Sequence, residues 1–82
     1  MSTAARVTAI ASRMLAKRGN PRAPAPGDKL RQAGLTSLDM VNLILAIEGE
    51  FDIEIPQGAM IPDNFDTIAA IAALVAATAR AA

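Results

Sequence analysis

The chain of 82 residues has no cysteine, histidine, tryptophan or tyrosine, and Phe51 and Phe65 are its only aromatic residues. The missing cysteine and histidine exclude a disulfide framework, a thiol nucleophile and the usual zinc-ligand sets, so we expect no metal site. The missing histidine also removes the usual general base, and we expect no enzyme. Any chemistry at neutral pH has to use carboxylates, amines, hydroxyl groups or a group attached after synthesis.

The small number of aromatic residues also limits the kind of core that the chain can build. Apolar residues make up 52% of the sequence, and most are aliphatic side chains or alanine. That composition favours packed helices over a sheet, and a chain this short forms one domain with a local core. We therefore predict a single all-α domain over residues 1–82, with an Ala-rich tail at 79–82 that frays.

The formal net charge of zero conceals a difference between the two halves of the chain. Residues 1–36 carry seven Lys or Arg and one acid, whereas residues 37–82 carry seven acids and one Arg. The two halves are therefore near +6 and −6. A partner-binding surface can be acidic although the whole protein is not.

The N-terminal 27 residues are rich in Arg and Ala and poor in acids, which is also typical of a mitochondrial transit peptide. We interpret them as structure, because so small a core can hardly lose an amphipathic helix. No apolar run is long enough to span a bilayer, since Arg13 and Lys17 interrupt the first one. We therefore expect a cytoplasmic protein without a membrane partner.

Apolar residues near the N-terminus recur at the spacing of one helix face, which predicts a helix over residues 3–18. Its buried stripe would consist of Val7, Ile10, Ala11, Met14 and Leu15. Residues 19–21 end the helix, and the prolines and Gly27 that follow predict a long loop. Leu30 and Leu35 are expected to anchor this loop in the core.

A second helix is predicted over residues 37–51, with Ser37 as its N-cap and Leu38 as its first helical residue. This helix carries two apolar stripes, where an amphipathic helix needs only one. The core stripe consists of Met40, Leu43, Ile44, Ile47 and Phe51, and the second stripe of Leu38, Val41 and Leu45. A small bundle has few elements to cover both, so we expect the second stripe to be partly exposed.

The remainder of the chain predicts one more long helix. An extended link at 52–56 precedes a brief helical turn at 57–61 and a break at 62–64. Asp66 or Thr67 then caps a last helix that runs to about residue 79. The inward-facing residues of that helix would be Ile68, Ile71, Leu74 and Val75.

The order of these features, over nearly the whole chain, resembles the acyl and peptidyl carrier protein family. The resemblance is carried by Gly34-Leu35-Thr36-Ser37-Leu38, Glu48-Gly49-Glu50-Phe51 and Ile53-Glu54-Ile55-Pro56. It implies an all-α bundle of three long helices and one short helix, with a long loop between the first two long helices. It also implies a covalent 4'-phosphopantetheine arm, taken from coenzyme A, on Ser37. Thr36 departs from the residue that usually precedes the modified serine.

The placement of such a serine has a physical reason. A phosphodiester at a helix start meets unpaired backbone N–H groups and the positive end of the helix dipole. The arm would also supply the thiol that this chain lacks. The plainer interpretation is that Ser37 only caps the helix, as most serines before an apolar run do.

The resemblance further implies that the second helix is a docking surface for partner enzymes. We predict docking by Leu38, Val41 and Leu45 of the second stripe, and by the acidic Asp39 and Glu48 beside it, which would attract basic patches. The alternative is that these acids belong to an ordinary solvated face. Asn42 and Gly49 stand where carriers of fatty acid synthesis often have Glu, which argues against docking to the standard fatty acid enzymes.

The expected function is therefore that of a stand-alone monomeric carrier that shuttles an aminoacyl or acyl group as a thioester. Its partners would be a phosphopantetheinyl transferase, an acyl- or aminoacyl-activating ligase and downstream acyl-accepting enzymes. An amino acid is favoured over a fatty or polyketide acyl chain by Asn42, Gly49 and the long segment at 62–65. The alternative of another class is an unmodified helical interaction domain that binds nucleic acid through its basic first half, but no aromatic residue lies there to stack bases.

Overall fold

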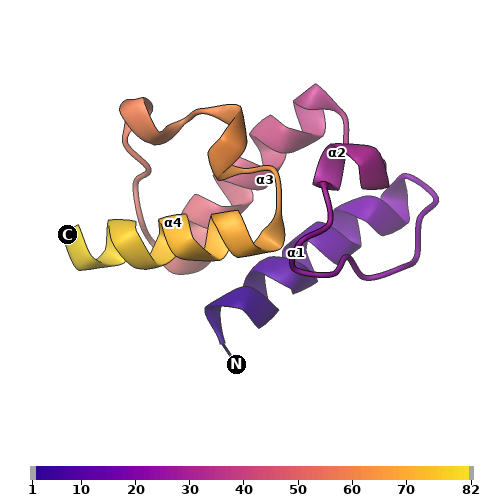
Figure 1. Cartoon of the computed structure of the whole chain (residues 1–82), viewed down its shortest axis with the longest axis horizontal. Coiled ribbons are helices and arrows are strands. Elements are labelled where there is room, and N and C mark those ends of the chain that lie inside the picture. The colour runs from indigo at the N-terminus through magenta and orange to yellow at the C-terminus, as the bar shows by residue number, and fades with distance from the viewer. Residues whose placement is uncertain (1, 82) are drawn as a thin grey trace.

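A computed structural model describes residues 2–81, and these residues form helices and connecting segments without a strand (Figure 1). The elements are α1 (Thr3–Lys17), α2 (Leu30–Ala33), α3 (Ser37–Phe51), α4 (Ile68–Ala81) and two 3-10 helices, η1 (Gln57–Ala59) and η2 (Pro62–Asn64). The predicted all-α bundle with three long helices is confirmed. The turn expected at 57–61 is present as η1, whereas the break expected at 62–64 is a further helical turn, η2.

Helix α1 begins where its sequence predicts. The Ser2 side chain accepts a hydrogen bond from the Ala5 amide at 3.1 Å and so caps the first turn. Four members of the predicted stripe are buried, and Met14 packs against them at the edge of the core. Arg18 follows the last helical residue and is the C-cap.

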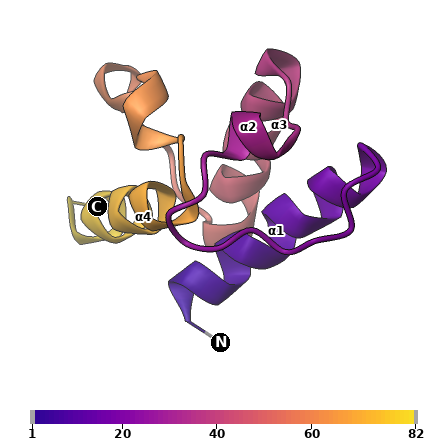
Figure 2. The same cartoon turned by 45° about the vertical axis from the view of Figure 1, so that its right-hand side comes forward.

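The connection between α1 and α3 differs from the plain loop that the prolines predict, because it contains α2. Leu30 and Leu35 are buried, which confirms them as anchors. The Leu30 amide donates to the Asp66 carbonyl at 2.8 Å, and the Ala69 amide donates to the Pro26 carbonyl at 3.0 Å. These bonds hold the connection against the start of α4, and Figure 2 shows it running along α1 before it turns beside α4. A four-residue helix was not predicted because it is too short to show a period.

Helix α4 packs across α1 and closes the core. The Thr67 hydroxyl accepts from the Ala70 amide at 3.1 Å, so Thr67, not Asp66, caps α4. Ile68, Ile71 and Val75 are buried as predicted, and Leu74 packs partly against them. The helix continues to Ala81, beyond its predicted end at 79, and of the tail expected to fray only residue 82 lies outside the described residues.

The helices of the described residues are too short or too polar to cross a lipid bilayer. Their packing instead uses apolar stripes on one side of each helix. The buried core consists of Val7, Ile10, Ala11, Leu15, Leu30, Leu35, Leu43, Ile47, Ile55, Phe65, Ile68, Ile71 and Val75.

Gly34 lets the chain turn from α2 into α3. Its φ of 132° lies in a region that side chains with a Cβ rarely adopt, and a Cβ built there would lie 3.8 Å from Leu15 Cδ2. An alanine side chain would therefore fit at this position, and the positive φ is what disfavours it. Gly49, by contrast, lies inside α3 with ordinary helical geometry and no neighbour within 4 Å of an added Cβ.

We predict opposite effects of alanine at these two glycines. Gly34→Ala should lower the free energy of unfolding by about 1 kcal/mol or more, because the positive φ becomes strained. Gly49→Ala should raise it by about 0.5–1 kcal/mol, because alanine is the better helix former. Urea unfolding of both variants measures this, and a neutral Gly34→Ala would contradict the proposed turn.

Candidate functional site

Ser37 is the first helical residue of α3 and is not its N-cap, so the predicted cap position is wrong by one residue. Thr36 has extended backbone angles (φ −83°, ψ 172°), and its hydroxyl accepts from the Asp39 amide at 3.1 Å. This register brings Asp39 to the third helical position, where its carboxylate accepts from the Thr36 amide at 2.9 Å. The two bonds form a complete capping box. If Ser37 were the cap, the third helical position would be Met40, which has no carboxylate to close the box.

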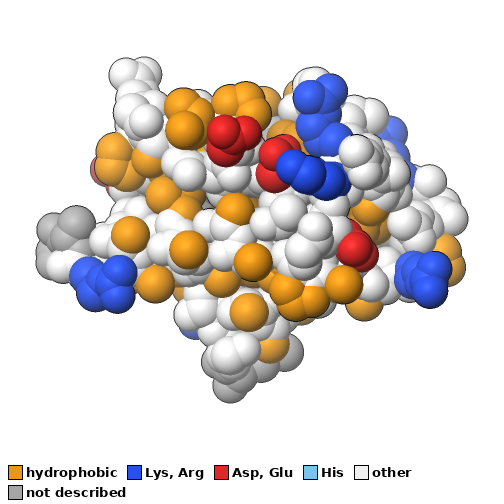
Figure 3. All heavy atoms as spheres, viewed as in Figure 1, with side chains coloured by type: hydrophobic (Ala, Val, Ile, Leu, Met, Phe, Trp, Pro, Cys, Tyr) orange, Lys and Arg blue, Asp and Glu red, His pale blue; other side chains and the backbone are white. Residues whose placement is uncertain are grey.

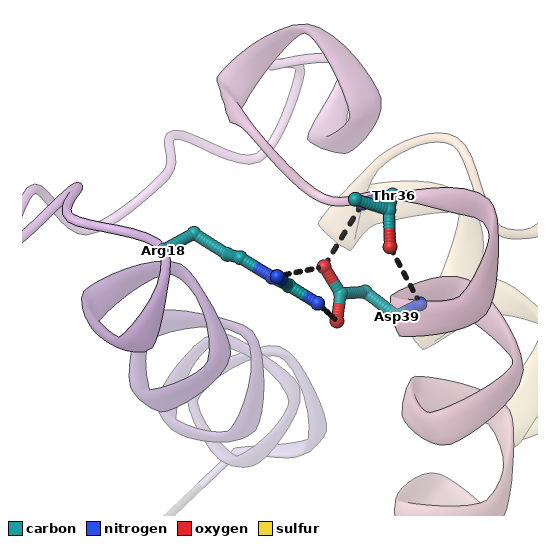
Figure 4. Close-up of polar contacts among 3 residues, drawn as sticks. All are labelled: Arg18, Thr36 and Asp39. Carbon is teal, nitrogen blue, oxygen red and sulfur yellow. Dashed lines mark hydrogen bonds and ion pairs between the residues drawn. The ribbon is translucent and has the colours of Figure 1, made fainter.

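The capping box is joined to α1 by an ion pair (Figure 4). Arg18 Nε donates to Asp39 Oδ2 and Arg18 Nη2 donates to Asp39 Oδ1, each at 2.8 Å. This two-pronged geometry fixes the orientation of both side chains. Asp39 is the single buried charged residue in the described part of the chain, with 7% of its surface exposed. The C-terminal end of α1 is thereby attached to the first turn of α3.

The pair changes the protonation equilibrium of both partners. The hydrogen bond from Arg18, with those from Thr36, holds the pKa of the Asp39 carboxyl well below its ordinary value, although burial opposes this shift. The same pairing with Asp39 raises the pKa of Arg18. Both groups are therefore charged at all pH values near neutrality.

The capping box leaves the Ser37 hydroxyl free. Ser37 is exposed, and its side chain makes no hydrogen bond to any other residue within 2–81. The box uses the amides of Thr36 and Asp39, so the amides of Ser37 and Leu38 at the start of the helix have no hydrogen-bond partner among residues 2–81. A free hydroxyl next to two unpaired N–H groups fits an attached phosphodiester.

An apolar groove of about 220 Å³ adjoins Ser37. One wall is α3, with Ser37, Val41 and Ile44, and the other is the segment that carries η1 and η2, with Met60 and Ile61. Figure 3 shows hydrophobic side chains gathered over that segment, with acidic and basic side chains at their border. Sequence reasoning missed Met60 and Ile61 as part of the site, although an apolar pair inside a Pro- and Gly-containing segment was a usable signal.

The structure separates the five predicted docking residues into two groups. Leu38, Val41 and Leu45 are 67%, 53% and 60% exposed, which confirms the partial exposure expected of the second stripe. Docking by these side chains remains a prediction.

The two acids predicted beside the second stripe are both engaged within the chain. Asp39 is turned away from solvent because Arg18 and Thr36 hold its carboxylate, so it could meet a partner only if these contacts were broken, and its docking role remains a prediction. Glu48 is half-buried, and its Oε2 accepts from the Ile55 amide at 2.9 Å. That hydrogen bond ties the end of α3 to the extended link that follows.

The basic first half of the chain also pairs internally. Arg6 contacts the Glu50 carboxylate at 2.8 Å and lies over the Phe51 ring, 4.3 Å from its centroid. Lys29 pairs with Asp66 at 3.3 Å. All three ion pairs among residues 2–81 therefore join a cation of the first half to an acid of the second.

The sequence profile of the phosphopantetheine attachment site family matches residues 5–75. The chain belongs to this family. Its members carry a phosphopantetheine group and are not themselves catalysts. The exposed Ser37 in the first turn of α3 lies within the matched residues.

Curated relatives of this family member include two proteins from Bradyrhizobium diazoefficiens. Aminoacyl carrier protein 1 is 48% identical and aminoacyl carrier protein 2 is 38% identical, each over 50 residues that make up 61% of this chain. The matched part is 56% of each relative, so the chain spans little more than half of their length.

Two solved structures share the fold. Both are of a Bradyrhizobium japonicum glycine:[carrier protein] ligase, one complexed with its cognate carrier protein and an analogue of glycyl adenylate, the other with glycylated carrier protein. The matched chains are 33% identical to this one, with TM-scores of 0.81 and 0.79. The match covers 92% and 88% of this chain and 96% of each matched chain.

The Arg18–Asp39 pair predicts an acid-sensitive stability. Because the pKa of Asp39 is lowered on folding, its contribution is fully present above the ordinary carboxylate range, begins to decline as the pH falls below about 4, and is lost as the pH falls further through the lowered pKa of the folded state. Asp39→Asn keeps an oxygen for the Thr36 amide but removes the charge, so it should be less stable than the wild type at pH 7. The difference should shrink at pH 3.

Denaturant unfolding at both pH values measures this difference. Asp63→Asn is the matched control, because Asp63 is exposed and has no ion-pair partner within residues 2–81. A gap between Asp39→Asn and the wild type that stays constant from pH 7 to pH 3 would show that the charge of Asp39 is not what stabilises the fold.

Proposed function

We propose that this chain is a carrier protein that bears a 4'-phosphopantetheine arm on Ser37 and shuttles an aminoacyl group as a thioester between partner enzymes. The observation that carries the proposal is the exposed, unbonded Ser37 hydroxyl at the start of α3, in a chain that matches the attachment family over residues 5–75. The matched structural neighbours support a carrier role, because their fold is shared over most of the chain and one of them contains glycylated carrier protein.

The residues around Ser37 favour attachment and retention of the arm. A phosphopantetheinyl transferase would join Ser37 Oγ to the phosphate next to the pantetheine of coenzyme A and release the nucleotide part. The Ser37 and Leu38 amides and the helix dipole would stabilise the phosphodiester charge. When bound, the arm supplies the thiol that this chain lacks.

An amino acid is the proposed cargo, in preference to a fatty or polyketide acyl chain. Two curated relatives are named aminoacyl carrier proteins, and the matched solved structures contain a glycine:[carrier protein] ligase. The neutral Asn42 and Gly49 on α3 point the same way. The proposed partners are a transferase, an amino acid:[carrier protein] ligase and enzymes that accept the aminoacyl group.

Intact-protein mass spectrometry tests the attachment. After incubation with coenzyme A and a phosphopantetheinyl transferase, the wild type should gain the mass of one arm. Ser37→Ala should gain none, because it lacks the oxygen that forms the phosphodiester. Ser12→Ala is the control and should be modified like the wild type. An arm on Ser37→Ala would refute the assignment.

Loading assays test the cargo. The arm-bearing protein should be aminoacylated by an amino acid:[carrier protein] ligase at least about tenfold faster than it is acylated by an acyl-ACP synthetase given a fatty acid. Labelled glycine and labelled fatty acid, followed by gel separation of the loaded protein, give both rates. Faster loading with the fatty acid would replace the aminoacyl assignment with the fatty acyl one and leave Ser37 as the attachment point.

A further inference from the structure

The exposed large hydrophobic residues of residues 2–81 are gathered on one face, around Ser37. They are Leu38, Val41, Leu45, Met60 and Ile61, each at least 41% exposed. Val41, Met60 and Ile61 line the same groove as Ser37. Exposed apolar side chains concentrated in this way mark an interaction surface. We call these five residues the apolar face.

We infer that the apolar face binds an apolar surface of the ligase that loads the arm, without pairing between acids on this chain and a basic patch on the partner. The inference rests on the proposed carrier function and specifies the chemistry of its partner. It reverses the expectation that the acidic second half attracts basic partners.

The acids of α3 beside the apolar face are already engaged within the chain. Asp39 is held by Arg18 and Thr36, Glu48 accepts from the Ile55 amide, and Glu50 is paired with Arg6. A carboxylate that is paired or hydrogen-bonded within the chain offers little to a partner unless that contact is first broken.

Three further acids in the second half, Asp52, Glu54 and Asp63, have no ion-pair partner within residues 2–81. Asp52 and Glu54 lie beyond the far end of α3, about 20 Å from Ser37 by the helical rise. That distance is more than twice the screening length of about 8 Å at physiological salt, whereas Leu45, at the near edge of the apolar face, is about 10 Å from Asp52 by the same rise, where screening is partial. Asp63, next to the groove-lining Pro62, is exposed, and Arg31, which lines the groove, carries the opposite charge.

The net charge close to the apolar face is therefore small, because Asp66 of the groove is also paired with Lys29, and Glu48 is the one acid of α3 beside the face without a cation partner within residues 2–81. Apolar burial depends weakly on salt, whereas steering between opposite charges falls steeply with it. A partner that fits this face has to offer apolar side chains of its own, and its binding should change little with ionic strength.

The test is the kcat/KM of a glycine:[carrier protein] ligase for the arm-bearing protein at about 50 and about 300 mM NaCl. Each value is divided by the rate of glycyl adenylate formation without carrier protein, which removes the effect of salt on the ligase itself. We expect the normalised values to agree within about twofold. A fall of about tenfold would overturn the inference.

Two variants identify the side chains responsible. Val41→Asp places a charge on the apolar face at an exposed position, and should lower kcat/KM at least about tenfold at both salt concentrations. Glu48→Gln is the matched control, because it removes charge but keeps an oxygen for the Ile55 amide, and it should load like the wild type. A loss in Glu48→Gln with normal loading of Val41→Asp would overturn the inference.

Light scattering separates a partner enzyme from a second copy of this chain. We expect a monomer at the concentrations of the assay. A dimer that Val41→Asp dissociates would assign the apolar face to self-association and contradict the inference. Absence of arm attachment to Ser37 by the transferase would instead refute the proposed function, so the two failures are distinguishable.

Discussion

The two-pronged contact between the Arg18 guanidinium and the Asp39 carboxylate fixes the end of α1 to the first turn of α3. Asp39 also closes the capping box with Thr36, so one carboxylate sets both the register of α3 and its attachment to the neighbouring helix. Ser37 lies between Thr36 and Asp39 in the sequence. Its exposure and its free hydroxyl follow from the fact that Thr36, not Ser37, performs the capping.

The opposite charges of the two halves of the sequence pair with each other within the folded domain. Cations of the first half meet acids of the second half in Arg18–Asp39, Arg6–Glu50 and Lys29–Asp66. The last two pairs are exposed, and such pairs contribute little to stability. They nevertheless neutralise charges that would otherwise face solvent without a partner. The surface near Ser37 is consequently apolar and close to neutral, although the half of the chain that contains it is acidic.

The long helices could be predicted from sequence because their apolar stripes have helical spacing and coincide with the buried residues of α1, α3 and α4. The location of Ser37 at a helix start was predictable for the same reason. The cap was misplaced because Thr and Ser are both good capping residues. The choice between them depends on Asp39, whose partner Arg18 is distant in sequence. That contact leaves no periodic signal, and neither does the four-residue helix α2.

The residues of the groove beside Ser37 could likewise be predicted from the sequence only in part. Val41 could be assigned to an exposed stripe from its spacing, but Met60 and Ile61 come from a segment without period. Only the packing of that segment against α3 brings them to the same groove. The acids of α3 differ from Met60 and Ile61, because the sequence did draw attention to them. Their charge predicted docking, whereas the carboxylates of Asp39 and Glu48 accept hydrogen bonds from backbone amides within the chain.

The proposed function depends on Ser37 as the attachment point of the arm. The most direct measurement is peptide mass spectrometry of the protein after reaction with coenzyme A and a phosphopantetheinyl transferase. Trypsin yields a peptide of residues 32–80, which contains Ser37 and three threonines. Fragmentation is predicted to place a single arm on Ser37. An arm on Thr36, Thr67 or Thr78, or no arm at all, would contradict the account.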